Sequence, residues 1–296
     1  MNYITFLFRK AVFAHLLVPL WKNRIQRRKM RNHVMAELCE AYVRDIPVVI
    51  PKDAVPERLP KEYIFSMWLQ GEEQAPTVVK SCWDSIRRHC TEELVILDAD
   101  NISNWIDLPE KIMEKWKSGK IKSSHISDLC RVELLWKYGG YWMDATDYMC
   151  HPMPEFIAQQ PFFIYLGDEM GYSPFIQSCF IRAHAHHPII GAWREIIRTY
   201  LTQHSRVFDY YLIHRLFRHI VLTDGKLSEL FAQMPHISQS CTHTVRWRGY
   251  WEKPFNAQVF QQLSQEGAFQ KLEYKSRSTR KPTKGTFADY IVNGRI

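Results

Sequence analysis

One pattern constrains the fold of this chain more than any other. It is a predicted helix, followed by two glycines and a short strand that ends in acidic residues. From residue 123 to residue 138 apolar side chains recur at helical spacing. Asp128 and Arg131, three residues apart, share another face of this helix and can point at one ligand. Gly139 and Gly140 end the helix, because glycine adopts backbone angles that the neighbouring apolar residues resist. The pattern predicts a helix, a sharp break and a strand.

The predicted strand ends in acidic residues. Residues 141–143 are aromatic and apolar, and Asp144, Ala145, Thr146 and Asp147 follow them. Carboxylates just past the end of a strand lie where open α/β sheets bind ligands. Two acids and a hydroxyl within four residues supply hard oxygen atoms, which suit Mn²⁺ or Mg²⁺ bridging to a diphosphate better than they suit zinc. We interpret Asp144 and Asp147 as candidate metal ligands beside a phosphate-bearing ligand.

Each piece of this pattern also has a purely structural interpretation. An Asp and an Arg on one helix face commonly form an exposed ion pair. Four residues of this kind after a strand commonly form a turn whose side chains bond their own backbone. The ordered combination of helix, glycine pair, strand and acids favours a ligand site over these alternatives.

These residues resemble the sugar-nucleotide-binding region of glycosyltransferases that carry an Asp-X-Asp motif. The resemblance is to the capsular polysaccharide synthesis group, which is related to the mannosyltransferase and clostridial glucosylating-toxin lineages. It rests on SDLCR at residues 127–131, KYGG at 137–140 and DAT at 144–146. It covers residues 63–154 and extends more weakly to the C-terminus, where residues 209–214 and 286–291 also look like segments of this group.

The resemblance implies a role for each matching position. Trp68, in the segment FSMWLQGEE, falls where an aromatic residue of the family stacks on the nucleotide base, and Gln70 and Gly71 fall in the adjoining nucleotide loop. Asp128 and Arg131 fall where the family holds donor-sugar hydroxyls and the diphosphate.

The acidic motif departs from the plain family pattern. Asp144 matches the first acid, but Thr146 stands at the second acidic position and Asp147 follows it. The capsule group itself commonly reads Asp-Ala-Thr, so the resemblance supports a metal role for Asp144 more than for Asp147. Gly140 and Thr146 are also assigned to donor binding. A basic run near the C-terminus comprises Lys271, Lys275, Arg277, Arg280, Lys281 and Lys284. This run either covers the diphosphate or is a solvated tail. Within it, Lys275 is assigned to donor binding.

The chemistry of sugar transfer agrees with this division of roles. The reaction breaks the bond between a sugar and a nucleoside diphosphate, and a divalent metal and a fixed guanidinium stabilise the charge on the leaving group. Asp144 with its metal and Arg131 fit those roles, and Asp128 can position or stabilise the cation-like sugar centre. We therefore predict Asp128, Arg131 and Asp144 as catalytic residues and Mn²⁺ or Mg²⁺ as cofactor. The resemblance implies retention of anomeric configuration.

Alternating strand and helix patterns predict an α/β fold with a mostly parallel central sheet. A helix opened by Pro76 lies between two predicted strands, and strand, helix, strand favours parallel pairing. The resemblance specifies a GT-A type nucleotide-binding sandwich, over residues 59–296, after a basic helical extension and proline-rich linker over residues 1–58. Strands are expected near residues 64–69, 94–97, 141–143, 162–166 and 175–182, and helices near 76–89, 109–117, 123–138, 189–202 and 207–222.

Composition is compatible with such an enzyme. The chain has 296 residues, of which 46% are apolar, and this is enough for a large α/β domain. Its seven cysteines are scattered and form no Cys-X-X-Cys motif, which argues against a disulfide framework or a zinc site. A reducing cytoplasm is the expected compartment.

The formal net charge of +8 is concentrated toward the termini. An apolar run over residues 11–21 is flanked by basic residues, and it is far below the ~20 apolar residues that span a bilayer. Residues 1–32 either contact an anionic membrane surface, at the inner face of a bacterial plasma membrane, or form a solvated or packed basic helix. Membrane contact would bring the enzyme to a lipid-linked acceptor.

The sequence thus predicts a metal-dependent glycosyltransferase that moves a sugar from a nucleotide-diphosphate donor to a growing surface polysaccharide or lipid-linked glycan. The alternative is a non-catalytic sugar-nucleotide or carbohydrate-binding protein of the same fold, since binding needs the same groove. Nucleic acid is not an expected partner, because the sequence has no helix-turn-helix, RNP or finger pattern.

Overall fold

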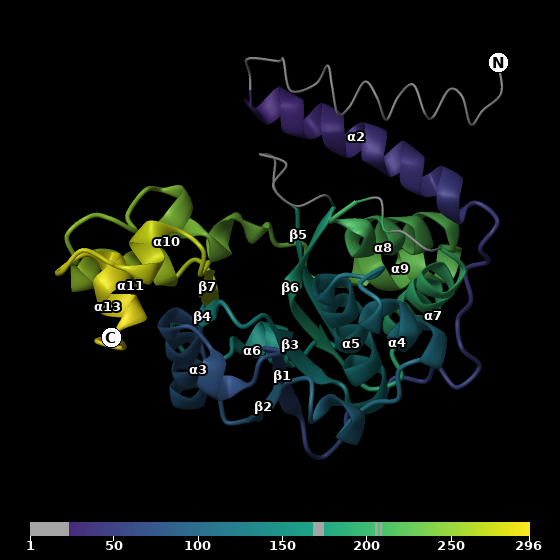
Figure 1. Ribbon diagram of the computed structural model, residues 1–296, viewed down its shortest axis with the longest axis horizontal. Helices are drawn as coiled ribbons and strands as arrows, with labels where there is room; N and C mark the ends of the chain where they lie inside the picture. Colours follow the sequence, from purple (N-terminus) through teal and green to yellow (C-terminus); the bar gives the residue numbers. More distant parts are fainter. Residues whose placement is uncertain (1–23, 168–174, 205–206, 208) are drawn as a thin grey trace.

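A five-stranded sheet with the order β2-β1-β3-β6-β5 forms the centre of the protein (Figure 1). The computed structural model describes residues 24–167, 175–204, 207 and 209–296. Parallel pairing joins β1 to β2 and to β3, whereas β6 is antiparallel to both β3 and β5. All strands of this sheet except β6 therefore point the same way, which confirms the predicted mostly parallel sheet. The strands are β1 (Tyr63–Met67), β2 (Glu93–Leu97), β3 (Gly140–Met143), β5 (Phe162–Leu166) and β6 (Ile176–Ala183).

Both faces of the sheet are covered, so successive side chains enter two different cores. Phe65, Trp142 and Ile181 belong to one cluster of buried side chains. Their neighbours Tyr141 and Phe180 belong to the other. This alternation follows from the period of two in a strand, and it explains why the strands read as continuous apolar runs.

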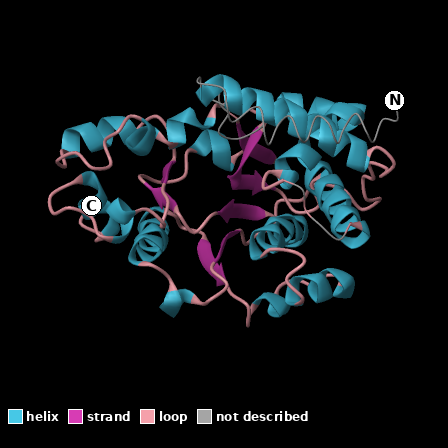
Figure 2. Cartoon of the chain, turned by 45° about the horizontal axis from the view of Figure 1, so that its top comes forward, coloured by secondary structure: helices cyan, strands magenta, loops and turns pink. Residues whose placement is uncertain are grey.

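Helices flank the sheet on both sides (Figure 2). Those that pack on the first core are α4 (Glu110–Lys117), α5 (Ser123–Tyr138), α7 (Pro188–Gln203), α8 (Leu212–Thr223) and α9 (Gly225–Gln233). Those on the side of the second core are α3 (Thr77–His89), α6 (Glu155–Ala158), α10 (Thr244–Trp247), α11 (Ala257–Ser264), α12 (Arg277–Arg280) and α13 (Phe287–Val292). Short 3₁₀ turns cover Glu72–Gln74, Ile102–Asn104 and Gln239–Thr242.

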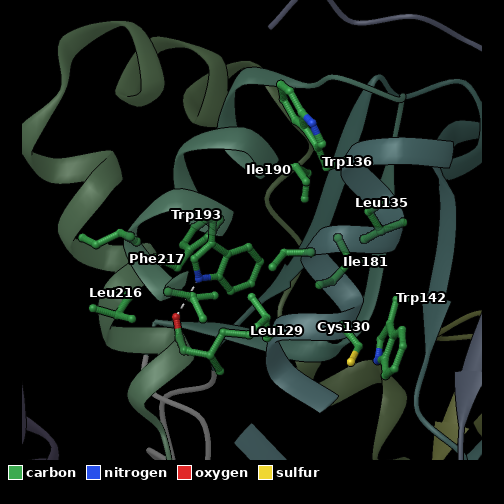
Figure 3. Packing of buried hydrophobic residues seen from close by; sticks show 14 of the residues in the cluster. Leu129, Cys130, Leu135, Trp136, Trp142, Ile181, Ile190, Trp193, Leu216 and Phe217 are labelled. Atoms are coloured by element: carbon green, nitrogen blue, oxygen red, sulfur yellow. Dashed lines mark hydrogen bonds between the residues drawn. The ribbon is translucent and has the colours of Figure 1, made fainter. Parts of the chain in front are cut away.

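Aromatic packing joins α7 to α8, and buried charge fixes α5 against α7. Trp193 of α7 is fully buried, lies with its ring centroid 4.7 Å from that of Phe217, and donates a hydrogen bond to the carbonyl of Ile213 at 2.9 Å (Figure 3). Glu133 of α5 is also buried and forms ion pairs with Arg194 and Arg198 of α7. Because removing one partner from a buried pair leaves an uncompensated charge, these contacts fix the position of the helix that carries Asp128 and Arg131.

A second, two-stranded sheet brings the C-terminal part of the chain to the end of β3. Strand β4 (Asp147–Met149) is antiparallel to β7 (Phe269–Lys271), and the register places Asp147 opposite Lys271. Side chains directly opposite each other in such a pair are close neighbours. The acidic turn therefore meets a lysine from far along the chain.

Helix α2 (Arg24–Val43) lies along α8 (Figure 1). Arg215 donates a hydrogen bond to the carbonyl of Asn32 at 3.0 Å, and Arg218 pairs with Glu40 at 2.6 Å. Most of the segment predicted to contact a membrane, residues 1–23, lies outside the described residues. Among the helices of the described chain, none combines the length and the apolar character that crossing a membrane requires.

Most predicted elements lie close to their predicted bounds, with one clear exception. The predicted helix over 207–222 begins only at Leu212, and residues 210–211 form a turn instead. Asp209 is buried and bound to Arg215, while the neighbouring Tyr210 is 68% exposed. Tertiary contacts at this point override a sequence that reads as continuous helix.

Gly140 tests how closely β1 and β3 approach. Its φ is +81°, and an added Cβ would lie 2.4 Å from the carbonyl oxygen of Tyr63. Gly140→Ala should lower the free energy of unfolding by about 3 kcal/mol, because strain and a backbone clash add. Gly285→Ala is the matched control, since Gly285 has φ +82° and open space around it. In urea unfolding, Gly285→Ala should lower the free energy of unfolding by about 1 kcal/mol. Equal losses of stability in both variants would contradict the close approach of β1 and β3.

Candidate functional site

The ends of β1 and β3 open into a cavity of about 580 Å³. This is the carboxyl edge of the parallel strands, where α/β proteins bind ligands, and the volume is in the range of small-molecule sites. Of the predicted site residues, those that line the cavity are Trp68, Gln70, Asp128, Arg131, Asp144 and Thr146. The cavity thus brings together residues from the loop after β1, from α5 and from the turn after β3.

Arg131 is buried in the wall of the cavity and held in one orientation. Its Nη2 lies 2.9 Å from Asp128 Oδ1, and its Nη1 donates to both the carbonyl and the hydroxyl of Ser178. The guanidinium also lies over the ring of Trp142, 5.0 Å from the ring centroid. Burial opposes the charge of Arg131, but Asp128 and Asp144 outweigh it and raise its pKa. The result is a permanent, preorganised cation facing the cavity.

Asp144 lies beside this cation. Its Oδ1 is 3.7 Å from Arg131 Nη2 and accepts a hydrogen bond of 2.9 Å from Trp142 Nε1. Its Oδ2 lies 2.8 Å from Lys271 Nζ. Burial works against ionisation of Asp144, but Lys271 and Arg131 hold its pKa below the usual value. Asp144 is therefore an ionised carboxylate with both oxygens engaged, in the same cavity as Arg131.

Asp147 takes part in the turn rather than in the cavity wall. Its backbone N–H donates to the carbonyl of Asp144 at 2.9 Å, and its Oδ2 accepts from the N–H of Asp144 at 3.2 Å. The side chain has no exposed surface, and its Oδ1 lies 3.0 Å from Lys271 Nζ. Burial raises the pKa of Asp147 above its usual range, and the two carboxylates raise that of Lys271. The turn interpretation of these residues thus describes Asp147 well.

The predicted carboxylate pair does not fit a divalent metal in this arrangement. Asp144 and Asp147 do converge on one point, but the ammonium of Lys271 lies there, 2.8 Å and 3.0 Å from the two oxygens. Asp147 also has no surface on the cavity. No group of three or more potential metal-ligating side chains of His, Cys, Asp or Glu occurs within the described part of the chain. Of the described residues of the acidic turn, Asp144 and Thr146 line the cavity with side chains that carry oxygen atoms.

An aromatic pair also lines the cavity. Trp68, in the loop after β1, packs edge-on against Tyr274, with ring centroids 5.0 Å apart. Within the described residues, Trp68 Nε1 has no hydrogen-bond partner. Aromatic faces of this kind are suited to stacking on a planar base. Tyr274 was not predicted as a site residue, because it follows β7 and reaches the cavity only through the β4–β7 pairing.

His214, in the segment 209–214 that resembles the capsule group, lies in the cavity wall. It is buried, and its Nε2 lies 3.4 Å from the hydroxyl of Ser178, which in turn binds Arg131. Burial, reinforced by Arg131 and Arg215, lowers the pKa of His214 to about 3. The imidazole is therefore neutral at physiological pH and adds a polar, uncharged group to the cavity.

Three predicted donor-binding residues do not line the cavity. Gly140 lies at the opposite end of β3 from Asp144, and its structural role is the close approach to Tyr63. Gly71 has φ +84° and shapes the loop that carries Trp68 and Gln70 without lining the cavity itself. Lys275 is exposed, with its ammonium over the ring of Tyr274. The sequence pattern did not distinguish these three residues from the nearby predicted residues that line the cavity.

The chain belongs to the capsular polysaccharide synthesis protein family, which it matches over residues 18–291. This confirms the predicted family. O-glycosyltransferase braB of Annulohypoxylon truncatum is 26% identical over 186 residues, which span 56% of this chain and 44% of that protein. The chain therefore covers less than half the length of this relative. Among solved structures, the PaToxG glycosyltransferase is similar at 14% identity and a TM-score of 0.38, over 69% of this chain and 85% of that one.

His214 makes the stability of the protein pH-dependent in a defined direction. Its pKa of about 3 in the folded protein lies below the value of about 6.5 expected in the unfolded chain. The unfolded state therefore takes up a proton first, and the contribution of His214 is present above about pH 6.5 and lost as the pH falls toward 3. His214→Gln should make the thermal midpoint fall less steeply between about pH 6.5 and pH 5.

The matched control is His33→Gln, which changes an exposed histidine on α2. Burial also lowers the pKa of His187 to about 3 and that of His243 to about 4. His214→Gln should therefore reduce the dependence of the thermal midpoint on pH without abolishing it. An unchanged slope in His214→Gln would show that this imidazole is not buried as described.

Proposed function

We propose that this protein is a glycosyltransferase of the GT-A type that binds a nucleotide-diphosphate sugar in the cavity at the ends of β1 and β3. The observation that carries the proposal is the placement of Arg131 and Asp144, 3.7 Å apart, in a cavity that an aromatic pair also lines. A cation and a base-sized aromatic surface within one cavity match the two ends of a sugar nucleotide. The family and the similarity to an O-glycosyltransferase support the same class of reaction.

Each part of the cavity has a role in this proposal. The aromatic pair of Trp68 and Tyr274 binds the base, and the fixed guanidinium of Arg131 stabilises the charge that develops on the departing diphosphate. Asp128 accepts hydrogen bonds from the hydroxyl groups of the sugar. Its carboxylate is already oriented by Arg131 and by His125, whose Nδ1 lies 3.3 Å from Asp128 Oδ2. Retention of configuration stays a prediction from the family resemblance.

The requirement for Mn²⁺ or Mg²⁺ also stays a prediction. A metal held by Asp144 and by donor phosphate oxygens would supply Lewis-acid stabilisation of the leaving group. The transfer step proposed for Arg131 and Asp128 does not depend on it. Assays with and without Mn²⁺ decide this point separately from donor binding.

A surface polysaccharide or lipid-linked glycan is the proposed acceptor, in keeping with the family. Peripheral contact of residues 1–32 with the inner face of a bacterial plasma membrane remains part of this proposal, and a cytoplasmic location goes with it. Co-sedimentation of the full chain with anionic vesicles, compared with a chain lacking residues 1–23, tests the contact.

A panel of nucleotide sugars tests the proposal directly. At least one should raise the thermal midpoint and be slowly hydrolysed by the purified protein. Arg131→Lys should then lower hydrolysis about 100-fold, because a point ammonium cannot replace the guanidinium fork at the leaving group. Arg248→Lys, at an exposed ion pair with Glu266, should leave hydrolysis unchanged.

The pattern of results separates the candidate functions. Binding of a sugar nucleotide without any turnover, in the presence or absence of Mn²⁺, would favour the non-catalytic binding protein. Near-normal hydrolysis by Arg131→Lys, with an unchanged thermal midpoint, would remove Arg131 from the site.

Trp68→Ala tests the base-binding end of the cavity. The variant should bind the nucleotide sugar about tenfold more weakly, because stacking on one aromatic contributes about 1–3 kcal/mol. Binding of inorganic pyrophosphate should be unaffected, since the diphosphate end is intact. Trp247→Ala, at a half-buried tryptophan of α10 outside the cavity lining, serves as the control in titration calorimetry. Equal losses for pyrophosphate and for the sugar nucleotide would contradict a stacking role.

A further inference from the structure

Lys271 lies where two carboxylates converge. Its Nζ is 2.8 Å from Asp144 Oδ2 and 3.0 Å from Asp147 Oδ1. These three side chains come from β7, from the turn after β3 and from the start of β4. Two carboxylate oxygens directed at one point form a site for a cation, and here the cation belongs to the chain itself.

The backbone fixes this lysine in place. In the antiparallel pair of β4 and β7, Lys271 is the register partner of Asp147, so its Cα position follows from the ladder. The N–H of Leu272 donates to the carbonyl of Thr146 at 2.8 Å and continues the pairing into the acidic turn. Only 18% of the Lys271 side chain is exposed, and it does not line the cavity. A surface lysine that samples many rotamers would not have these constraints.

We propose that Lys271 is an internal counter-cation that closes the Asp144–Asp147 carboxylate pair to divalent metal in the free protein. Mg²⁺ and similar ions bind carboxylate oxygens at about 2.0–2.1 Å, and an ammonium at hydrogen-bond distance from the same oxygens leaves no room for them. Moving the ammonium aside would leave a charged group buried without a partner, which is costly. The lysine also positions Asp144, since Trp142 holds Oδ1 and Lys271 holds Oδ2.

The role of Lys271 beside Asp144 and Asp147 is proposed for the donor-free protein, independently of the proposed function. A metal that reaches Asp144 together with a bound diphosphate is compatible with it. What it excludes is a metal held between Asp144 and Asp147 by the protein alone.

Binding of Mn²⁺ to the full chain, without any nucleotide, tests the proposal. Titration calorimetry and the electron paramagnetic resonance signal of free Mn²⁺ both report the dissociation constant at mildly alkaline pH, where carboxylates are ionised. The wild-type protein should bind Mn²⁺ only weakly. Lys271→Met should bind it about tenfold or more tightly, because affinity for hard cations rises with the number of available carboxylate ligands. Lys271→Met combined with Asp147→Asn should lose this gain.

Lys226→Met is the matched control, because it removes the same charge from an exposed position on α9. It should leave Mn²⁺ binding unchanged. Where Lys271→Met fails to fold, Lys271→Gln replaces it, since the amide still donates a hydrogen bond to a carboxylate but carries no charge. The proposal is overturned by tight Mn²⁺ binding to the wild-type protein, by no gain in a folded Lys271 variant, or by a gain that survives Asp147→Asn.

Discussion

The carboxylate of Asp144 is the point on which the rest of the site depends. It ends a central strand, lies beside the guanidinium that α5 supplies, and binds the ammonium that β7 supplies. Two neighbouring segments, α5 and the turn after β3, therefore meet the distant strand β7 at one charged group. Because each of the two cations is largely buried, the acid and both bases hold one another in their ionised forms. Loss of the acid would leave two buried positive charges close together.

This arrangement explains how charged side chains can be buried in the wall of the cavity. Asp128 and Asp144 neutralise Arg131 from two sides, while Ser178 binds its remaining face. Such a network costs little reorganisation when a charged ligand arrives, since its groups are already oriented. The neutral imidazole of His214 adds a polar wall without altering the charge balance.

Local patterns predicted much of the fold and part of the site. The helix over residues 123–138 and the strand over 162–166 were predicted with the bounds that α5 and β5 have, because helical spacing and apolar runs are local signals. The predicted start of α8 was wrong: Asp209 lies before the helix and pairs with Arg215, which also binds the carbonyl of Asn32, a partner far away in the sequence. The sequence predicted Asp147 as a second metal ligand, and the local pattern contained no sign of its burial in the turn or of its pairing with Lys271. Gly140 looked like a ligand-binding glycine, but its conformation serves the approach of two strands.

The sequence by itself determined the family, the mostly parallel α/β architecture and the segments that supply Arg131 and Asp144, because these depend on spacing within short stretches. Only the tertiary structure decided which side chains face the cavity and which cation meets the acidic turn. Lys271 and Tyr274 reach the site through the register of β4 and β7, a long-range pairing that leaves no periodic signal in the chain. A single register step places a side chain on one face of a strand or the other, and that choice is made by packing.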